Sequence, residues 1–535
     1  MTSFWIVLIP PLLVIASVMA TRQIILSFLL GILASGLIVS QGNVSEALSI
    51  SGYYLWVSTG LSTVSTISGL LGSWNLLIFL FLICLGIIIV LLSESGAAQA
   101  YIRIVSNRVH SKKEAEGASL FLSLFFFIDD YFSALTVGSV MRPLAIAHNV
   151  HPIKLAFLTT AMATPLTLIS PLSSWVGEIV LQLKQVGITA EEPKTVVVAD
   201  PYLLFTYSIP YLLYPLLLIV CTWYIVIRGI SYGPMRKYDL KVSNAHPKAP
   251  HIDKKASFID FLVPIFTLVF GVFGMMLYTG NYSFLGGTES FASALKNSSV
   301  PGSLLTGGAA SVIVSIALYL ARGTIKPTKL GHHVLAGSQL MLPSIVMLIC
   351  AWALGALLKN DLRTGTYIAT HVSSIINMEL FPVICFLFAA LISWLIGSAW
   401  ATIGLMFPIT IELLQRLLDL PPNTPLSSVE ILIPLVGATL SGAAMGVHVS
   451  VLSDNPIMSA ASTRCDHLEH VKSMSWYVLP IALAAAIGFT IIGVKGDTMG
   501  LKQALLLGGA VSLLAALIFL ELLNYLYAKL FPLKN

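Results

Sequence analysis

Long apolar runs recur along the whole chain and are separated by short polar segments. A run of about 20 apolar residues is the length of a helix that crosses a bilayer, and the first two runs, 4–20 and 24–40, follow one another almost directly. Of the residues, 57% are hydrophobic and only 10% are charged, whereas a soluble domain carries about 25% charged residues. The sequence therefore predicts an all-α polytopic membrane protein with about eleven or twelve transmembrane helices, and segment 51–72, rich in Ser, Thr and Gly, is the marginal span.

Positive residues concentrate in short loops, which the positive-inside rule assigns to the cytoplasm. Three such loops are marked by Arg103, Arg108, Lys112 and Lys113, by Arg228, Arg236, Lys237, Lys241, Lys248, Lys254 and Lys255, and by Arg322, Lys326 and Lys329. Three apolar runs, 117–141, 155–180 and 201–228, lie between the first two loops, although loops on one side require an even number of crossings. We therefore expect 117–141 to be a re-entrant hairpin. Because the positive charge belongs to these loops, it does not indicate a nucleic-acid partner.

The C-terminal half gives the same order of segments with the opposite orientation, which is the inverted-repeat layout of secondary transporters. We expect a second hairpin and a second broken helix there, and a cytoplasmic C-terminus in a multi-pass protein of the inner (plasma) membrane. The expected divisions are N-terminal helices (1–72), a first repeat (73–278, with hairpin 117–141 and broken helix 155–180), a connecting span with loops (279–337), and a second repeat (338–535, with hairpin 381–411 and broken helix 429–462).

Two adjacent carboxylates, Asp129 and Asp130, lie in the first hairpin directly after a Phe-rich run. An ionised acid at bilayer depth costs several kcal/mol, so it is kept where it binds an ion, pairs or faces water. With no Lys or Arg before Arg142, cation or proton binding is favoured over a structural hydrogen-bond role.

Local sequence supports the repeat, with chance similarity in so apolar a composition as the alternative. Asp129–Ser133 aligns with Ser398–Thr402, and each segment soon reaches a Gly and a Met-x-Pro. Ser170-Pro171 aligns with Ser453-Asp454, each at the end of a run of small polar groups with a helix breaker close by. Unwound segments of this kind free backbone groups to meet a substrate near the midplane.

Several separated blocks of the chain, over roughly 75–495, resemble the NhaC family of sodium/proton antiporters, within the ion-transporter superfamily. The blocks are Phe127–Tyr131 with Val137–Pro143, Met341–Gly355, and Leu440–Ala443 through Ser453-Asp454 to Cys465–Val471. The resemblance implies a cation-coupled carrier, because members are associated with sodium/proton exchange, malate–lactate exchange and amino-acid uptake. It also implies a homodimer in which a scaffold part holds the partners together.

The chain departs from this family pattern where the family has Asp and hydroxyl groups. Thr160 replaces an Asp, Val447 replaces the Asp of a Gly-Asp-His, and Ala399 replaces the Ser of a Thr-Ser-Trp-Gly-Thr. The vacated space suits a larger, partly apolar solute. We therefore expect a secondary active transporter, a Na+- or H+-coupled carrier of a small organic solute such as an amino acid or carboxylate; the alternative is a Na+/H+ antiporter of the NhaC type.

The expected site for the coupling ion and the substrate consists mainly of carboxylates and hydroxyls. Its members are Asp129, Asp130, Ser133, Thr160, Thr164, Ser170, Ser173, Ser398, Trp400, Thr402, His448, Ser450, Ser453, Asp454 and Asn455. Hard cations prefer oxygen ligands, so a Na+ ion is expected at Asp129, Asp130 and Asp454. For His448, a satisfied core histidine is an equal alternative.

Other polar residues are assigned no role in the site. Asp466, His467, Glu469 and His470 are expected in a solvated loop, and Glu178 at an exposed membrane interface. Trp175 and Trp352 are expected to be interface or packing aromatics, and Arg142 is expected to pair with an Asp or to anchor the hairpin. The sequence has no P-loop and no oriented nucleophile that would indicate an enzyme. Apart from Na+ or H+ as coupling ion, no cofactor or structural metal is expected, and the lipid bilayer is the surrounding partner.

Overall fold

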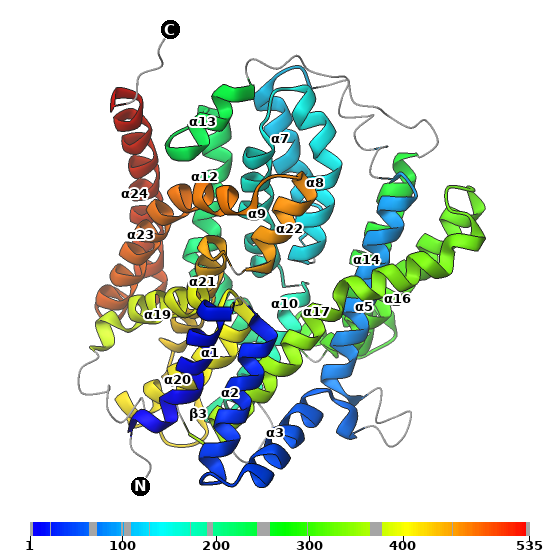
Figure 1. Ribbon diagram of the computed structural model, residues 1–535. Coiled ribbons are helices and arrows are strands. Elements are labelled where there is room, and N and C mark those ends of the chain that lie inside the picture. The colour runs from blue at the N-terminus through cyan, green and yellow to red at the C-terminus, as the bar shows by residue number, and fades with distance from the viewer. Residues whose placement is uncertain are drawn as a thin grey trace.

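The computed structural model describes most of the chain, and its main elements are helices (Figure 1). The described residues are 4–21, 23–63, 72–97, 100, 109–127, 129–171, 173–189, 196–242, 257–296, 298–363, 377–451 and 453–530. Of the basic residues that mark the expected cytoplasmic loops, five lie outside them: Arg103, Arg108, Lys248, Lys254 and Lys255. The expected all-α class with broken helices is confirmed.

Eight described helices are long and apolar enough to cross a membrane, or nine when a pair bent by 46° counts as one span. Three shorter apolar helices lie at Ile25–Val39, Ser133–Ala147 and Met378–Trp394. The sequence led us to expect eleven or twelve transmembrane helices, more than these eight or nine long ones, because an apolar run does not reveal where its helix stops. The marginal segment 51–72, for example, holds only the end of a helix and one 3-10 turn before residues 64–71, which are outside the described part.

One group of helices flanks the rest of the molecule (Figure 1). Its elements are α1 (Phe4–Thr21), α2 (Ile24–Val39), α3 (Val44–Ser58), η1 (Leu61–Thr63), α5 (Trp74–Glu94), α14 (Phe258–Thr279), η3 (Ser283–Leu285), α15 (Phe291–Lys296), α16 (Val300–Ala321) and α17 (Pro327–Asn360). Helices α5 and α17 approach closely through glycine, because a Cβ on Gly86 would lie 2.2 Å from the carbonyl oxygen of Gly337. An ion pair links the end of α16 to α14: Nε of Arg322 lies 3.1 Å from Oδ1 of the buried Asp260.

The central group contains two series of helices in the same order. The first series is α7 (Lys112–Ser123), α8 (Asp130–Ala147), α9 (Pro152–Ile169), α10 (Ser174–Gln185), α11 (Pro201–Ser208), η2 (Ile209–Tyr211), α12 (Leu213–Arg228) and α13 (Gly233–Val242). The second is η4 (Met378–Leu380), α19 (Phe381–Ile396), α20 (Ala399–Leu417), η5 (Leu426–Ser428), α21 (Leu432–Val449), α22 (Asp454–Thr463), α23 (His467–Met499) and α24 (Leu501–Leu530). The pair α7–α8 lies in the upper part of Figure 1 and α19–α20 in the lower part, as expected when two units have opposite orientation.

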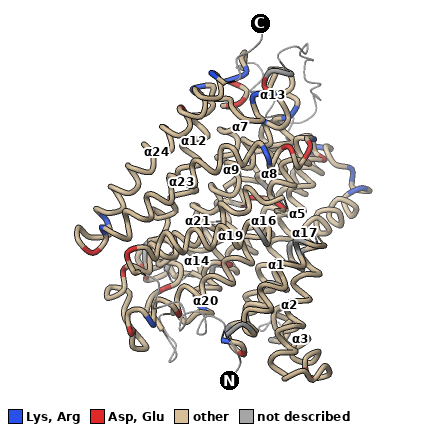
Figure 2. Tube along the Cα trace, turned by 60° about the vertical axis from the view of Figure 1, so that its left-hand side comes forward, with Lys and Arg blue, Asp and Glu red and all other residues tan. Residues whose placement is uncertain are grey.

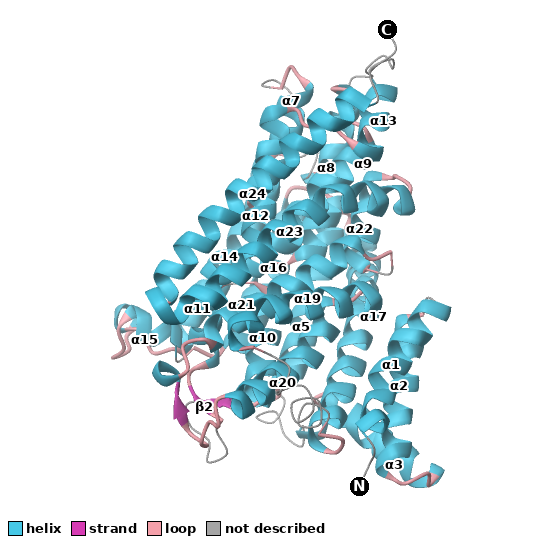
Figure 3. Ribbon diagram, turned by 90° about the vertical axis from the view of Figure 1, so that its left-hand side faces the viewer, coloured by secondary structure: helices cyan, strands magenta, loops and turns pink. Residues whose placement is uncertain are grey.

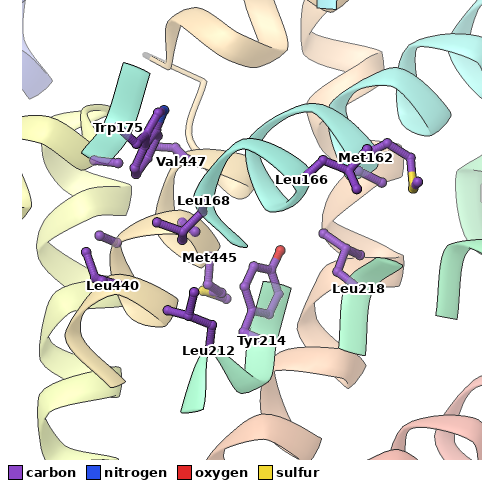
Figure 4. Packing of buried hydrophobic residues seen from close by; sticks show 14 of the residues in the cluster. Met162, Leu166, Leu168, Trp175, Leu212, Tyr214, Leu218, Leu440, Met445 and Val447 are labelled. Atoms are coloured by element: carbon purple, nitrogen blue, oxygen red, sulfur yellow. The ribbon is translucent and has the colours of Figure 1, made fainter. Parts of the chain in front are cut away.

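The two series exchange packing partners. Helix α22 of the second series packs against α8 of the first, and α10 of the first packs against α20 of the second. Apolar side chains of α9, α12 and α21, among them Leu166, Tyr214 and Met445, fill the space beside these contacts (Figure 4). The central group is therefore one packed body, and neither half is complete alone.

A small sheet joins the two series at one end. Strands β1 (Ile188–Thr189), β2 (Val197–Val198) and β3 (Thr424–Pro425) are parallel in the order β1-β2-β3, with Ile188 opposite Val197 and Val197 opposite Thr424. The sheet lies at the opposite end of the molecule from α13 (Figure 3). Lys and Arg gather at the α13 end, around α7 and the end of α24 (Figure 2).

Candidate functional site

The helices α9 and α21 end in breaks of the same construction. Each helix has 18 residues, and a serine lies at both ends of each break: Ser170 and Ser173, then Ser450 and Ser453. The first serine of each pair leaves the helix in extended geometry, with φ −83° and ψ 121° at Ser170 and φ −89° and ψ 127° at Ser450. The structure thus aligns Ser170 with Ser450, and the alignment with Ser453 expected from sequence is wrong by three residues. That alignment treated Pro171 and Pro456 as equivalent helix breakers. In the structure Pro171 lies inside the first break, whereas Pro456 lies inside α22.

Four helices begin close to one another in the centre of the molecule. They are α8 and α20, which start at the hairpin turns, and α10 and α22, which start at the breaks. Backbone N–H groups at a helix start carry a partial positive charge and remain free to bind a ligand. We call the contact between the starts of α8 and α22 the acid pole and the contact between the starts of α10 and α20 the aromatic pole.

Asp130, the first residue of α8, is the centre of the acid pole. Its Oδ1 accepts a hydrogen bond from Nε1 of Trp175 at 3.2 Å, and its Oδ2 accepts from Oγ1 of Thr164 and Nδ2 of Asn455, both also at 3.2 Å. The Asn455 amide also donates to Oγ1 of Thr164 at 2.6 Å. These donors come from α9, α10 and α22, so a single carboxylate joins three helices to α8.

Two further carboxylates adjoin Asp130. Asp129 is buried, and its Oδ2 accepts a hydrogen bond from Oγ of Ser174 at 2.8 Å. Asp454, the first residue of α22, accepts from the hydroxyl of Tyr131 and from its neighbour's backbone N–H at 2.9 Å. Ser453 donates to the same carboxylate at 3.5 Å.

Three carboxyl groups lie close together at the acid pole. Neither Asp130 nor Asp454 forms an ion pair with a Lys or Arg among the described residues. Buried charges need a partner of opposite sign, and carboxylates gathered in this way can bind a cation or protons. Carboxylate and hydroxyl oxygens are ligands that hard cations accept, and Asp129, Asp130 and Asp454 supply the charge.

The aromatic pole replaces these acids with indole rings. Trp400 of α20 lies against Trp175 of α10, with ring centroids 4.8 Å apart. Ser398 caps α20 by accepting from the backbone N–H of Ala401 at 3.3 Å, and Thr402 donates to the Ser398 carbonyl oxygen at 2.8 Å. Trp175 belongs to both poles, because its N–H binds Asp130 and its ring faces Trp400.

The structure brings together most of the residues expected at the site, but the side chains of Thr160 and His448 point away from it. Thr160 hydrogen-bonds His470 at 2.9 Å, one helical turn from Thr164, and His448 hydrogen-bonds Tyr214 at 2.6 Å. His448 is therefore buried in the core, with Nδ1 bonded to Tyr214, whereas its Nε2 has no hydrogen-bond partner among the described residues. The remaining serines, Ser133, Ser173 and Ser450, are buried beside the helix starts and the breaks.

Sequence reasoning missed several polar contacts. Trp175, expected only to pack, donates to Asp130. Tyr131 and Ser174 directly follow expected site residues in the chain, and that adjacency was the available signal.

Two residues expected to meet solvent are buried instead. Glu178 is 1% exposed, and His470 is fully buried against Thr160, because α10 and the start of α23 pack into the molecule. Arg142 forms no ion pair with an Asp of the described part of the chain; its Nε donates to the carbonyl oxygen of Thr463 at 3.1 Å.

Comparison with known proteins adds the family. A model of the Na+/H+ antiporter family matches residues 168–494, which is more than half of the chain. The chain belongs to the Na+/H+ antiporter family. The resemblance to NhaC antiporters seen in the sequence is thereby confirmed, and the protein is a cation-coupled membrane transporter.

Individual relatives of this antiporter family member are distant. An uncharacterized protein of Haemophilus influenzae is 28% identical over 500 residues, covering 92% of this chain and 91% of that protein. A malate-2H(+)/Na(+)-lactate antiporter of Bacillus subtilis is 28% identical over 155 residues, 29% of each chain. Among solved structures, the YdaH transporter of Alcanivorax borkumensis gives a TM-score of 0.49 with 14% identity, covering 85% of this chain and 90% of that one.

Proposed function

We propose that this antiporter family member carries a small organic solute, an amino acid or a carboxylate, and couples its movement to Na+ or H+. The observation that carries the proposal is the pairing of an acid pole with an aromatic pole across Trp175. The acid pole supplies the negative charge that a coupling ion requires. The two indoles supply an apolar surface that an ion alone does not need.

The organic solute would bind where the four helices begin. The partial positive charge at the starts of α10 and α20 favours an anionic group of the solute, and its apolar part would meet Trp175 and Trp400. The residues Thr160 and Val447 agree with this arrangement. Where the family pattern has further acids, this chain has Thr160, which bonds to His470, and Val447, which carries no charge, so the negative charge is confined to one side.

The alternative function is Na+/H+ exchange without an organic solute, and the family's name favours it. The acid pole alone would suffice for that activity, because a cation and protons can compete for the same carboxylates. The relative from Bacillus subtilis, a malate-2H(+)/Na(+)-lactate antiporter, shows that both ions and organic solutes occur among related carriers.

Orientation and assembly are also proposed. Lys and Arg gather at the α13 end, which the positive-inside rule assigns to the cytoplasm together with the C-terminus, and we place the protein in the inner (plasma) membrane. A homodimer remains an expectation from the family resemblance.

The deciding experiment is a solute panel in proteoliposomes, with sodium and pH gradients imposed separately. Saturable uptake of an unchanged amino acid or carboxylate that stops when the gradients are dissipated supports the proposal. Strong Na+/H+ exchange with no organic solute moved overturns it in favour of the alternative. Chemically altered solute inside the vesicles would indicate an enzyme instead.

A further inference from the structure

A fourth buried carboxyl lies apart from the acid pole. Glu178 follows Ser174 by four residues in α10, about 6 Å along the helix axis. Trp175, Glu178 and Gln182 are spaced by three and four residues, so they share one face of the helix. This face leads from the acid pole toward β1, at the end of the molecule opposite α13 (Figure 3).

The hydrogen bonds of Glu178 are divided unequally between its two oxygens. Its Oε1 accepts from Nε1 of Trp352 at 2.6 Å and from Nε2 of Gln182 at 2.7 Å. Its Oε2 is buried and has no hydrogen-bond partner among the described residues. A neutral carboxyl fits this pattern, because its carbonyl oxygen can accept both bonds. An ionised carboxylate would leave a charged oxygen without a donor in a buried place, which costs several kcal/mol.

The titratable groups around Glu178 do not offer it a charge partner. On the elements packed against α10, and on α17, the described ones are Cys84 and Glu94 of α5, His151 and Lys154 at the start of α9, Asp200 before α11, Tyr202 and Tyr207 of α11, Tyr319 and Arg322 at the end of α16, Lys329, His332, His333 and Cys350 of α17, and Glu412 and Arg416 of α20. None of them forms a hydrogen bond or ion pair with Glu178. Lys184, on α10 itself, lies over the ring of Trp74 at 5.0 Å.

Glu178 lies where the central helices meet the flanking group. Its partner Trp352 belongs to α17 and stacks on Phe79 of α5 with ring centroids 5.2 Å apart. The neighbouring Gly177 is also pressed against α5, because a Cβ there would lie 2.6 Å from Cδ1 of Ile78. A charge on Glu178 would therefore act directly on the contact between α10 and the flanking helices.

We propose that Glu178 is a proton-binding site separate from the acid pole. One proton is held on Oε2 while α10 contacts Trp352, and it passes to water when that contact opens; no other bond is made or broken. The role of this proton in coupling rests on the proposed function, whereas its presence on Glu178 is measurable without transport.

The first test is infrared spectroscopy of the purified full-length protein in lipid, recorded over a range of pH. The wild type should show a protonated-carboxyl band that is absent from Glu178→Gln and disappears as the pH is raised. A matched control is Glu430→Gln, which changes an exposed acid between η5 and α21 and should leave this band unchanged. Identical bands in the wild type and Glu178→Gln, or a Glu178 band that never titrates, would overturn the proposal.

The second test measures proton movement in proteoliposomes. Glu178→Gln should still bind ion and solute but move fewer protons per solute and lose the pH dependence of transport, while Glu178→Asp should retain it. If Glu178 were only structural, thermal stability would fall in Glu178→Gln with proton movement and pH profile as in the wild type, and the proposal would be wrong. Failure of the wild type itself to move any solute would overturn the proposed function, while the infrared result still decides the proton site.

Discussion

The acid pole and the aromatic pole are built from equivalent parts yet have opposite chemistry. Each is a contact between the second arm of one half's hairpin and the helix that follows the other half's break. At one pole these helix starts carry Asp130 and Asp454; at the other they carry Trp175 and Trp400. The comparison shows that one backbone arrangement can carry opposite chemistry, and that a few side chains in the first turns decide which pole holds carboxylates and which holds indole rings.

Replacement of the central carboxylate should have the largest effect. Asp130→Asn keeps the shape and the hydrogen-bonding capacity but removes the charge, so we expect ion-coupled transport to fall by about 100-fold with the protein still inserted. Transport in proteoliposomes measures it. Asp466→Asn is the control, because this exposed residue caps α23 and Asn caps a helix equally well. Coupled transport at the wild-type rate by Asp130→Asn would remove the acid pole from the mechanism.

Loss of an orienting amide should have a smaller effect at the same pole. Asn455→Ala removes one donor from Asp130, whereas Trp175 and Thr164 still hold the carboxylate. A hydrogen bond to a charged group contributes about 1.5 kcal/mol or more, so we expect ion activation to weaken about tenfold. The measurement is transport rate against ion concentration. An unchanged activation curve would show that Asn455 does not help to form the ion site.

The aromatic pole should respond through the solute and not through the ion. Trp400→Leu removes the ring that faces Trp175, and aromatic pairs contribute about 0.5–1.5 kcal/mol, so the solute KM should rise about two- to tenfold with ion activation unchanged. Trp394→Leu, on an exposed part of α19, is the matched control and should behave as the wild type. Equal loss of solute and ion activation would mean that the two poles do not act separately.

The smallest effect is expected outside both poles, at the α13 end. Asp239 is bonded to Lys112 at 2.7 Å. Burial by itself raises the pKa of Asp239, but the charges of Lys154 and Lys112 outweigh it and hold that pKa below its usual 3.8. The ionised form therefore stabilises the fold above this range, and the contribution is lost as the pH falls through the lowered pKa.

The corresponding variant tests that sign. Asp239→Asn should lower thermal stability in detergent by about 1 kcal/mol or less at pH 7, because Lys112 is partly exposed, and the difference from the wild type should vanish below pH 3.8. Transport should be unchanged. Lys237→Gln, an exposed change on the same helix, serves as control. A difference that grows on acidification would contradict the assignment.

Features with a high free-energy cost in a bilayer could be predicted from sequence. Acids at bilayer depth and interruptions of apolar runs are costly, so Asp129, Asp130 and the breaks near Ser170 and Ser453 stood out. The contacts of Trp175 and Glu178 could not be predicted, because they depend on which face α10 turns toward α8 and α17. Periodicity within an all-apolar helix does not give that rotation. The same ambiguity placed Thr160 and His448 at the site, whereas their side chains face His470 and Tyr214.

The exchange of packing partners between the halves has a consequence for how the protein is made. Asp130 and its partner Asn455 are 325 residues apart in the chain. At about 5–20 residues per second, a ribosome needs roughly 15–65 seconds to synthesise that interval. Throughout this time the newly inserted first half holds buried acids without the helix that completes their surroundings. Until α22 has been synthesised and inserted, protonation of these acids, or a position near the lipid headgroups, must lower the free-energy cost of holding them in the membrane. A chain truncated before α22 would keep this unsatisfied acid surface and present it to the cell's quality control.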